Sequence, residues 1–224
     1  MNNIGAPRYP NAQQRLALEQ RWPLDRANFI VSDCNAEALA AIEAWPGWPD
    51  GKLALIGPEG SGKSHLAAIW ARTAGAITAE RALADEERAR GRPILLEDAD
   101  RWRPEEALFH LFNRTEAGTS LLLTAREPPM AWSTRLPDLR SRLNAVMVAE
   151  LQGPDDVVLG GLLEKFFRER NILPRRSVLD YLLRRIERSA PAALAVVERI
   201  DEAAAAENRN VTRELVRGVL GEVD

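Results

Sequence analysis

Residues 57–64 form a complete G-x-x-x-x-G-K-[ST] phosphate-binding loop, which constrains the fold more than any other feature of the chain. The motif functions only between a β-strand and an α-helix, and here it lies between an apolar run at residues 53–56 and a helical pattern at residues 65–74. Backbone N–H groups of such a loop face the phosphates, the lysine reaches the β- and γ-phosphates, and the serine hydroxyl can ligate Mg²⁺. The sequence therefore predicts a site for ADP or ATP with Mg²⁺, formed by Gly57, Pro58, Glu59, Gly60, Ser61, Gly62, Lys63, Ser64 and His65.

The composition is that of an ordinary globular protein. The chain has 224 residues, of which 46% are hydrophobic and 28% charged, and a formal net charge of −3. This length suits one domain, or a domain with a small appendage, and the net charge gives no overall attraction to nucleic acid. Cys34 is the single cysteine, so no internal disulfide forms. No apolar run is long enough to span a bilayer and the N-terminus lacks the apolar block of a secretory signal, so we expect a cytoplasmic protein without membrane contact.

Strand-like apolar runs alternate with helical patterns over the first two thirds of the chain. The strand candidates lie at residues 53–56, 76–78, 93–100, 120–125 and 146–148, and the helical patterns between and before them at 32–45, 65–74, 80–90 and 105–115. This alternation predicts an α/β fold, with a parallel sheet covered by helices on both faces. After residue 153 only helical patterns follow, at 155–170, 177–188, 191–208 and 212–222. We therefore expect a flexible arm at residues 1–26, an α/β domain at 27–152 and an all-helical domain at 153–224.

Two carboxylates follow the strand candidate that comes after the phosphate-binding loop. A buried strand that delivers acidic side chains beside the loop is what a Mg²⁺–nucleotide site needs. On this interpretation Glu97 and Ser64 hold the metal, and Asp98 polarises an attacking water. The alternative is a strand that ends in a solvated acidic turn. Downstream of a complete phosphate-binding loop, the functional interpretation is favoured.

Three segments resemble the DnaA branch of the AAA+ ATPases. In residues 62–66 a histidine and a leucine follow the lysine and serine of the loop, as in that branch. Residues 122–129, Leu-Leu-Thr-Ala-Arg-Glu-Pro-Pro, are similar to its sensor 1 strand, and residues 136–143, Leu-Pro-Asp-Leu-Arg-Ser-Arg-Leu, resemble its arginine-finger helix. The similarity spans roughly residues 13–222 and is closest to the short Hda-type homologues, in their alphaproteobacterial form. It implies an AAA+ nucleotide-binding domain followed by a small helical lid.

The resemblance puts Arg142 at the arginine-finger position. A guanidinium there can neutralise charge that develops on a γ-phosphate held by a neighbouring subunit. The alternative is a surface arginine on an amphipathic helix. Arg140, two residues earlier, is expected to face another side of the helix and is the weaker candidate.

The N-terminal arm contains a Q-x-x-L-x-L pattern of the kind that docks on the bacterial sliding clamp. Leu16 and Leu18 would enter an apolar pocket of the clamp while Gln13 makes a polar anchor. Such a motif becomes ordered on binding. The alternative is an arm without this role, but the position N-terminal to a DnaA-like domain favours the docking motif.

Two residues depart from the pattern of the family. Pro191 stands where the lid of DnaA-like proteins carries the sensor 2 arginine, and Arg188, one turn earlier, is a partial substitute. Arg126 stands where sensor 1 commonly has a small acidic or polar residue. These departures predict slow intrinsic ATP hydrolysis and favour a nucleotide, ADP above all, that is held as a structural cofactor.

Basic residues are concentrated in residues 165–188, with eight basic and three acidic side chains. This segment could contact DNA phosphates, but a solvated helix surface is the favoured interpretation. His65 and His110 lack partners at metal-ligand spacing, so no metal beyond Mg²⁺ is implied. The six tryptophans do not interleave with the basic segment and are interpreted as packing residues.

The resemblance implies a negative regulator of replication initiation. Its arm would bind the DNA polymerase III beta sliding clamp, and so reach DNA indirectly, while Arg142 stimulates hydrolysis of ATP held by DnaA. The alternative from the enzyme class is a stand-alone AAA+ ATPase, a remodeller or helicase loader, which would use Arg142 within a homodimer or larger homo-oligomer. A third possibility, a DNA-binding initiator fragment, is disfavoured because no residues remain for an origin-reading domain.

Overall fold

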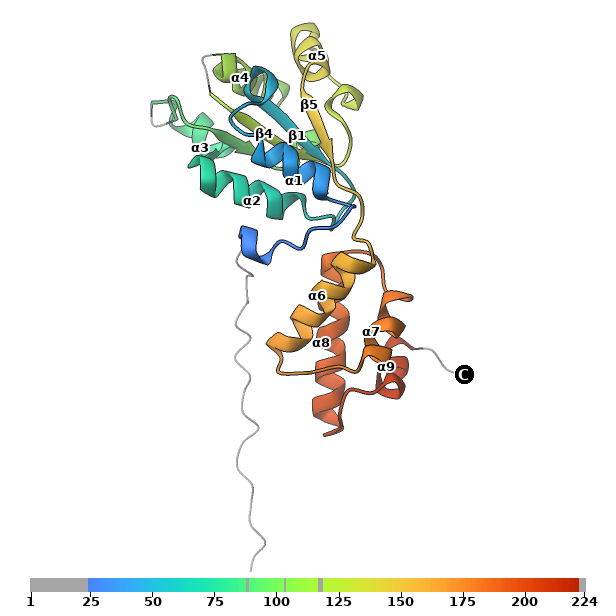
Figure 1. Ribbon diagram of the computed structural model, residues 1–224. Helices are drawn as coiled ribbons and strands as arrows, with labels where there is room; N and C mark the ends of the chain where they lie inside the picture. The colour runs from blue at the N-terminus through green and yellow to red at the C-terminus, as the bar shows by residue number, and fades with distance from the viewer. Residues whose placement is uncertain (1–23, 88, 103, 117–118, 222–224) are drawn as a thin grey trace, which may run out of the picture.

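The computed structural model describes residues 24–87, 89–102, 104–116 and 119–221. Its centre is a fully parallel five-stranded sheet in the order β2-β3-β4-β1-β5 (Figure 1). The predicted α/β fold class is therefore confirmed. The clamp-docking pattern at Gln13, Leu16 and Leu18 lies outside the described residues. The strands are β1 (Lys52–Ile56), β2 (Ile77–Thr78), β3 (Ile94–Leu96), β4 (Leu121–Ala125) and β5 (Met147–Glu150).

Helices cover both faces of the sheet, because successive side chains of each buried strand point to opposite faces. In β1, Leu53 and Leu55 pack with α1 (Ala36–Glu43) and α2 (Lys63–Ala74). Ala54 and Ile56 pack on the other face, with α3 (Ala79–Ala84), α4 (Glu105–Glu116) and α5 (Pro137–Asn144). Four short 3₁₀ turns complete this unit, at Arg26–Asn28, Pro49–Gly51, Ala99–Arg101 and Pro129–Ala131.

Several helices are shorter than their sequence patterns predict. The patterns at residues 32–45 and 177–188 give helices over Ala36–Glu43 and Arg176–Leu183. The pattern at residues 80–90 becomes α3, which ends at Ala84, followed by turns. The Arg114 guanidinium donates to the backbone carbonyls of Ala82 and Glu86, with N···O distances of 3.3 and 3.1 Å. Acidic side chains at 85–87 also oppose the dipole at a helix C-terminus. A competing donor and unfavourable charge therefore end the helix early.

The chain after β5 forms a separate helical layer with its own hydrophobic core (Figure 1). It consists of α6 (Asp156–Glu169), α7 (Arg176–Leu183), α8 (Ala190–Ala206) and α9 (Arg213–Leu220). Three of these helices begin with side-chain caps, since Asp155, Ser189 and Thr212 each accept a hydrogen bond from the first turn that follows. Within the described ranges, none of the helices has the length and apolar character that crossing a bilayer requires.

Candidate nucleotide-binding site

The phosphate-binding loop joins β1 to α2 at the carboxyl edge of the sheet, where parallel α/β folds bind their ligands. The loop needs glycine at two close contacts. Gly57 has a φ of 146°, and a Cβ there would lie 2.1 Å from the carbonyl oxygen of Leu151. Gly60 has a φ of 73°, and its Cβ would lie 2.6 Å from Cβ of Ser189 in the helical layer. The loop therefore packs closely against Leu151, which follows β5, and against Ser189, which precedes α8.

Lys63 lies inside the loop. Its ammonium group donates to the carbonyls of Gly57 and Pro58, at 2.8 and 2.7 Å, and the residue is only 9% exposed. Burial lowers the pKa of Lys63, and the charge of Asp98 is the largest effect that opposes this shift. A buried cation that donates to carbonyls of its own loop is poised to exchange them for phosphate oxygens.

Two serines of the loop differ in exposure. Ser61 is buried, and its hydroxyl oxygen has no hydrogen-bond partner within the part of the chain that is described. A buried hydroxyl without a partner is unusual and fits a site that is completed by a ligand. Ser64 lies exposed in the first turn of α2, as a Mg²⁺ ligand requires.

The predicted acidic pair follows β3, and both Glu97 and Asp98 are exposed. Asp98 adopts a left-handed φ of 49°, and its N–H donates to the Thr124 hydroxyl at 3.1 Å, which fastens this turn to the end of β4. Asp98 is also the carboxylate that acts most strongly on Lys63. Of the two carboxylates, Asp98 is therefore the one with an electrostatic link to the phosphate-binding loop.

Sequence reasoning missed Asp100. One of its carboxylate oxygens accepts the backbone N–H of Arg126 at 3.3 Å, and the other is buried without a partner in the described residues. Asp100 also acts on Lys63. Its position two residues after Asp98 is the sequence feature that could have indicated a third carboxylate near the loop. The 3₁₀ turn at Ala99–Arg101 that carries Asp100 cannot be recognised in the sequence.

The donor set fits Mg²⁺ of the kind found in P-loop sites. Mg²⁺ prefers oxygen ligands and takes only one or two from the protein when phosphates supply others. Ser64, Glu97 and Asp98 offer a hydroxyl and carboxylates at this edge. No cluster of three or more His, Cys, Asp or Glu side chains able to hold a metal is found in the described ranges.

A slot of about 170 Å³ lies beside the loop, between the segment that follows Leu24 and helix α6. His65 forms part of its wall. The His65 Nε2 atom lies 2.9 Å from the carbonyl oxygen of Asp25, and the imidazole meets the Phe29 ring edge-on, with centroids 5.2 Å apart. Burial lowers the pKa of His65, which favours the neutral ring. The Lys165 ammonium closes the slot from α6 by donating to the Asn28 side chain at 2.9 Å. A largely apolar slot next to a phosphate loop suits a nucleotide base.

The start of α8 lies against the loop, and Pro191 is part of this contact. A Cβ on Gly60 would lie 3.2 Å from Cδ of Pro191, so Pro191, which the resemblance puts at the sensor 2 position, lies against the loop and brings no side-chain donor. Arg188 does not take over this position, because its guanidinium bonds Asp156 at 2.6 Å and the Pro154 carbonyl at 3.3 Å.

Arg142 lies in the last turn of α5, with its guanidinium 5.1 Å from the centre of the Phe109 ring. Helix α5 ends at Asn144, three residues before β5 begins, so Arg142 is at the amino edge of the sheet. Figure 1 shows α5 at the end of the α/β unit away from the helical layer. Arg140 has a different role, because it donates to the carbonyls of Met130 and Trp132 at 3.0 and 2.6 Å.

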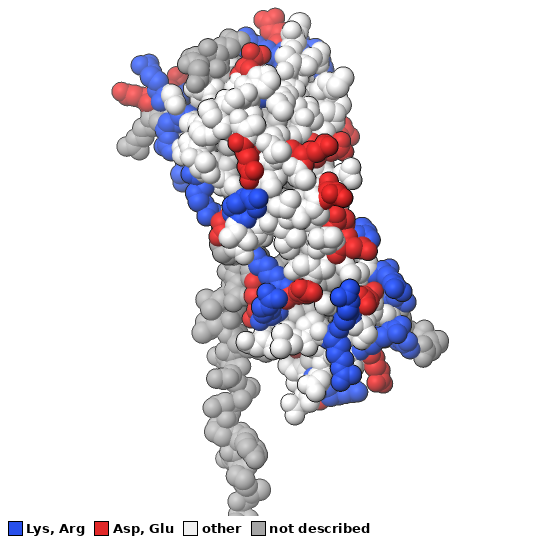
Figure 2. All heavy atoms as spheres, viewed as in Figure 1, with Lys and Arg blue, Asp and Glu red and all other residues white. Residues whose placement is uncertain are grey.

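Basic side chains gather over the helical layer, in the lower part of Figure 2. Several of them are paired. Arg170 bonds Glu198 at 3.0 Å, and Tyr181 stacks with two guanidinium groups, those of Arg185 at 4.0 Å and Arg213 at 4.9 Å. These contacts agree with the interpretation of the basic segment as a helix surface.

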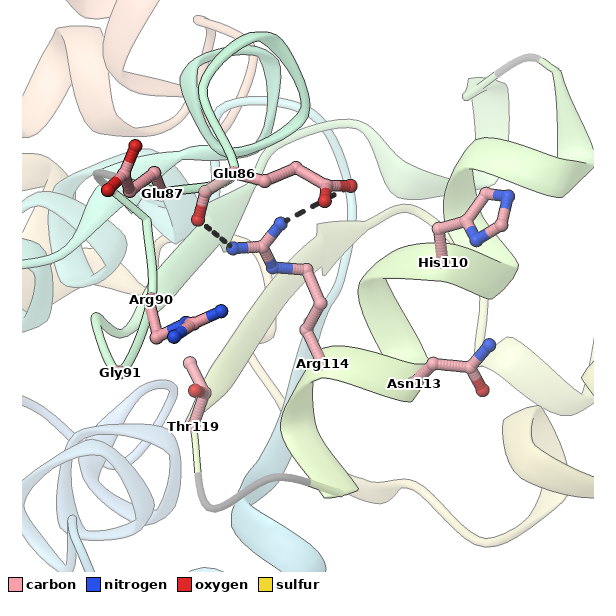
Figure 3. Close-up of a pocket in the computed structure, with 8 residues that line it drawn as sticks. All are labelled: Glu86, Glu87, Arg90, Gly91, His110, Asn113, Arg114 and Thr119. Atoms are coloured by element: carbon pink, nitrogen blue, oxygen red, sulfur yellow. Dashed lines mark hydrogen bonds and ion pairs between the residues drawn. The ribbon is translucent and has the colours of Figure 1, made fainter.

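A larger groove of about 770 Å³ lies near the amino edge of the sheet (Figure 3). Its side chains do not converge on one point. Arg114 turns toward Glu86, whereas His110 and Asn113 extend from α4 in another direction (Figure 3). The groove has charged residues in its lining, but they do not surround one buried cation as the charges around Lys63 do. It is lined by Glu86, Glu87, Arg90, Gly91, His110, Asn113, Arg114 and Thr119.

No family model matches the chain. A curated relative, an uncharacterized protein of Haemophilus influenzae, is 31% identical over 123 residues, which are 54% of this chain and 52% of the relative. The chain thus spans about half the length of that relative.

Solved structures give a wider match. Domain III of the replication initiation protein DnaA from Thermotoga maritima aligns with a TM-score of 0.71 and 19% identity, over 88% of this chain and 95% of that domain. DnaA of Aquifex aeolicus bound to AMPPCP aligns with a TM-score of 0.63 and 21% identity, over 81% of this chain and 65% of that DnaA chain. The RuvB Holliday junction branch migration motor of T. maritima aligns with a TM-score of 0.68 and 17% identity, over 89% of this chain and 72% of RuvB. The chain therefore has the fold of DnaA domain III and of RuvB.

Proposed function

We propose that this chain is an AAA+ protein that binds ADP or ATP with Mg²⁺ at the carboxyl edge of its sheet. The observation that carries the proposal is Lys63, a buried cation inside a glycine-shaped loop at a helix start, with Asp98 acting on it from the neighbouring turn. Ser64 and Glu97 or Asp98 would contribute to the metal, and the slot around His65 would take the base. The DnaA structures with bound AMPPCP support a nucleotide in this fold.

The bound nucleotide would serve mainly to shape the domain. Pro191 brings no donor to the loop, and Arg188 is engaged by Asp156. A phosphate group would then lack the lid cation that accelerates hydrolysis by stabilising developing charge. We expect slow intrinsic turnover and retention of ADP.

Arg142 would act on a nucleotide held by a second molecule. The phosphate-binding loop follows the carboxyl end of β1, whereas Arg142 precedes the amino end of β5, the parallel neighbour of β1. The five residues of β1 separate the carboxyl edge from the amino edge, which is roughly 16 Å at 3.3 Å per residue. This separation supports a role in trans. DnaA is the proposed recipient, since the chain shares the fold of DnaA domain III.

The proposed biological role is that of an Hda-type negative regulator of replication initiation. Gln13, Leu16 and Leu18 would dock the protein on the DNA sliding clamp, and Arg142 would stimulate hydrolysis of ATP bound to DnaA. Together these two activities would convert DnaA to its ADP-bound form close to DNA that carries the clamp. The docking motif comes from the sequence pattern and the Arg142 role from the family resemblance.

The test is the hydrolysis of DnaA-bound ATP in the presence of clamp loaded on DNA. The wild-type protein should accelerate hydrolysis, and Arg142→Ala should remove most of the acceleration, since a guanidinium in trans contributes about 10³-fold or more. Arg209→Ala, on the far end of the lid, is the control for loss of one charge. Deleting residues 1–20 should abolish the dependence on clamp. No stimulation by the wild type would overturn the proposed role.

A stand-alone ATPase is the second candidate, favoured by the exposed carboxylates of Glu97 and Asp98 that follow β3 beside the phosphate-binding loop. It predicts rapid turnover of ATP by the purified protein without partners, through Arg142 of a second copy. Turnover that survives deletion of residues 1–20 and is lost in Arg142→Ala would select this candidate.

A further inference from the structure

Helices α7 and α9 pack against each other in the helical layer and carry a local excess of positive charge. Val178 and Leu182 of α7 are buried in the same core as Leu215 and Val216 of α9, so the two helices are held in a fixed arrangement. Figure 2 shows Lys and Arg side chains over the part of the helical layer in which Figure 1 places these helices. We call this the arginine surface, and it consists of Arg175, Arg176, Arg184 and Arg185 at and beside α7, and of Arg213 and Arg217 on α9.

The charge of the arginine surface is opposite in sign to that of the whole chain. Residues 175–185 and 213–217 contain six arginines and two carboxylates, an excess of four positive charges, whereas the whole chain has a net charge of −3. The two carboxylates are Asp180, 3.9 Å from the Arg176 guanidinium, and Glu214, 3.9 Å from that of Arg209. A basic patch of this kind provides the local attraction to a polyanion that the overall charge does not.

Tyr181 brings guanidinium groups from two elements together. Its side chain belongs to a residue that is only 4% exposed, and the guanidinium carbons of Arg185 and Arg213 lie 4.0 and 4.9 Å from the centre of its ring. The negative face of the ring attracts cations and so offsets part of the repulsion between two like charges held close together. A bound anion would offset the rest and would accept hydrogen bonds from both elements.

The chemistry of the arginine surface fits the phosphate backbone of duplex DNA. A guanidinium binds a phosphate group through two parallel hydrogen bonds. Among the large apolar side chains that are exposed in the described part of the chain, none lies in α7 or α9, whereas the centre of a protein interface is apolar and depleted of charge. Because the Tyr181 ring is buried beside two guanidinium groups, it offers no platform on which the bases of a single strand could stack.

We propose that the arginine surface binds the backbone of duplex DNA directly, without reading its sequence. This inference goes beyond the proposed function, in which DNA is reached through the clamp. The surface belongs to the helical layer, whereas Arg142 lies at the end of the α/β unit away from that layer (Figure 1). If the protein also docks on a clamp loaded with DNA, the high effective concentration of the duplex makes a weak direct contact sufficient.

The test is the binding of a short fluorescein-labelled duplex to the full chain, measured by fluorescence anisotropy without nucleotide, clamp or DnaA. With about four phosphates contacted, we expect a Kd of about 10⁻⁵ M or tighter at ~50 mM salt and a slope of log K against log salt of about −3.6. Arg184→Gln combined with Arg213→Gln should weaken binding by roughly tenfold and reduce the magnitude of the slope by about 2. Glu214→Gln removes a carboxylate from the surface and should strengthen binding several-fold.

The matched control is Arg81→Gln combined with Arg90→Gln, which removes two exposed arginines from the α/β unit. This variant should keep the wild-type affinity and slope. Duplexes rich in A·T and in G·C pairs should bind equally well, since backbone contacts carry no sequence information. Thermal unfolding of each variant verifies that the exposed substitutions leave the fold intact.

The proposal is overturned if the wild type does not bind the duplex at low salt, or if the control variant loses as much affinity as the variant of the arginine surface. Vesicles that contain anionic phospholipid are the competing polyanion. If they bind the wild type more tightly than the duplex does, with the same dependence on Arg184 and Arg213, the partner is a membrane surface and the proposal fails. The proposed function is tested separately through hydrolysis of DnaA-bound ATP, so either proposal can fail while the other stands.

Discussion

The two edges of the central sheet carry cavities that differ in size and in the arrangement of the charged residues around them. At the carboxyl edge, a slot of about 170 Å³ adjoins a loop where charges from three strand ends act on one buried lysine. At the amino edge, a groove of about 770 Å³ is lined by side chains that extend apart (Figure 3). The larger of these two cavities is therefore not the one at the proposed nucleotide site. Parallel strands deliver loops, helix N-termini and charged residues to one edge, and convergence of those groups is the better criterion.

The sharpest way to break this comparison is to remove one lysine from each edge. Lys63→Ala should weaken nucleotide binding by about 100-fold or more, because a charge-assisted hydrogen bond contributes ~1.5–3 kcal/mol and Lys63 can make several. Lys52, equally buried at 9% exposed, lies at the amino end of β1 and donates to the Asp50 carbonyl. Lys52→Ala should leave affinity unchanged. Titration with a fluorescent ADP analogue measures both, and equal losses would contradict the assignment.

A pair of glycine substitutions tests the contact between loop and lid. Gly60 and Gly91 have nearly the same left-handed φ, 73° and 71°. A Cβ on Gly60 would meet Ser189, whereas one on Gly91 would meet nothing within 4 Å among the described residues. Gly91→Ala should cost about 1–2 kcal/mol from backbone strain alone. Gly60→Ala should cost roughly 2–4 kcal/mol, since the helical layer must also shift. Urea unfolding gives the free energies of unfolding of the two variants. Equal losses would mean that the helical layer does not pack closely against the loop at Gly60.

The amino edge should respond to substitution through stability and not through binding. Arg114→Ala removes the donor for the carbonyls of Ala82 and Glu86 and should lower the free energy of unfolding by about 1 kcal/mol. Nucleotide affinity should stay at the wild-type value in the same titration. A clear loss of affinity would make the groove part of the binding site.

The smallest expected effect is a pH dependence at His65. Burial lowers its pKa below the usual 6.5, so the unfolded chain binds a proton more readily than the folded one. His65 therefore contributes stability that is fully present above about pH 6.5 and lost as the pH falls through the lowered pKa. Between about pH 7.5 and pH 5, His65→Gln should lose less stability than the wild type. Urea unfolding at both pH values measures this, and parallel losses would show that His65 titrates normally.

Much of the fold could be predicted because its signals are local. The apolar run at residues 53–56 and the glycines around Lys63 specify strand, loop and helix without reference to distant residues. The alternation of strands and helices then indicates a parallel sheet. Helix α3 shows the limit of this reasoning, since Arg114, about thirty residues away, captures its carbonyls and ends it early.

The candidate site was predictable only in part. The loop and the acidic turn carry recognisable motifs, but the contact between Asp100 and the backbone of Arg126 depends on which strands are neighbours. Strand order is not encoded in any short segment. The same holds for Pro191, whose position against Gly60 depends on how the helical layer folds back on the loop.

The most direct measurement is hydrogen–deuterium exchange of the full chain with and without ADP and Mg²⁺. The account predicts slower exchange at the carboxyl edge, in residues 57–65, 97–100 and 24–30, and unchanged exchange around residues 86–91 and 110–114 at the amino edge. Protection confined to the amino edge, or no protection anywhere at saturating nucleotide, would contradict it.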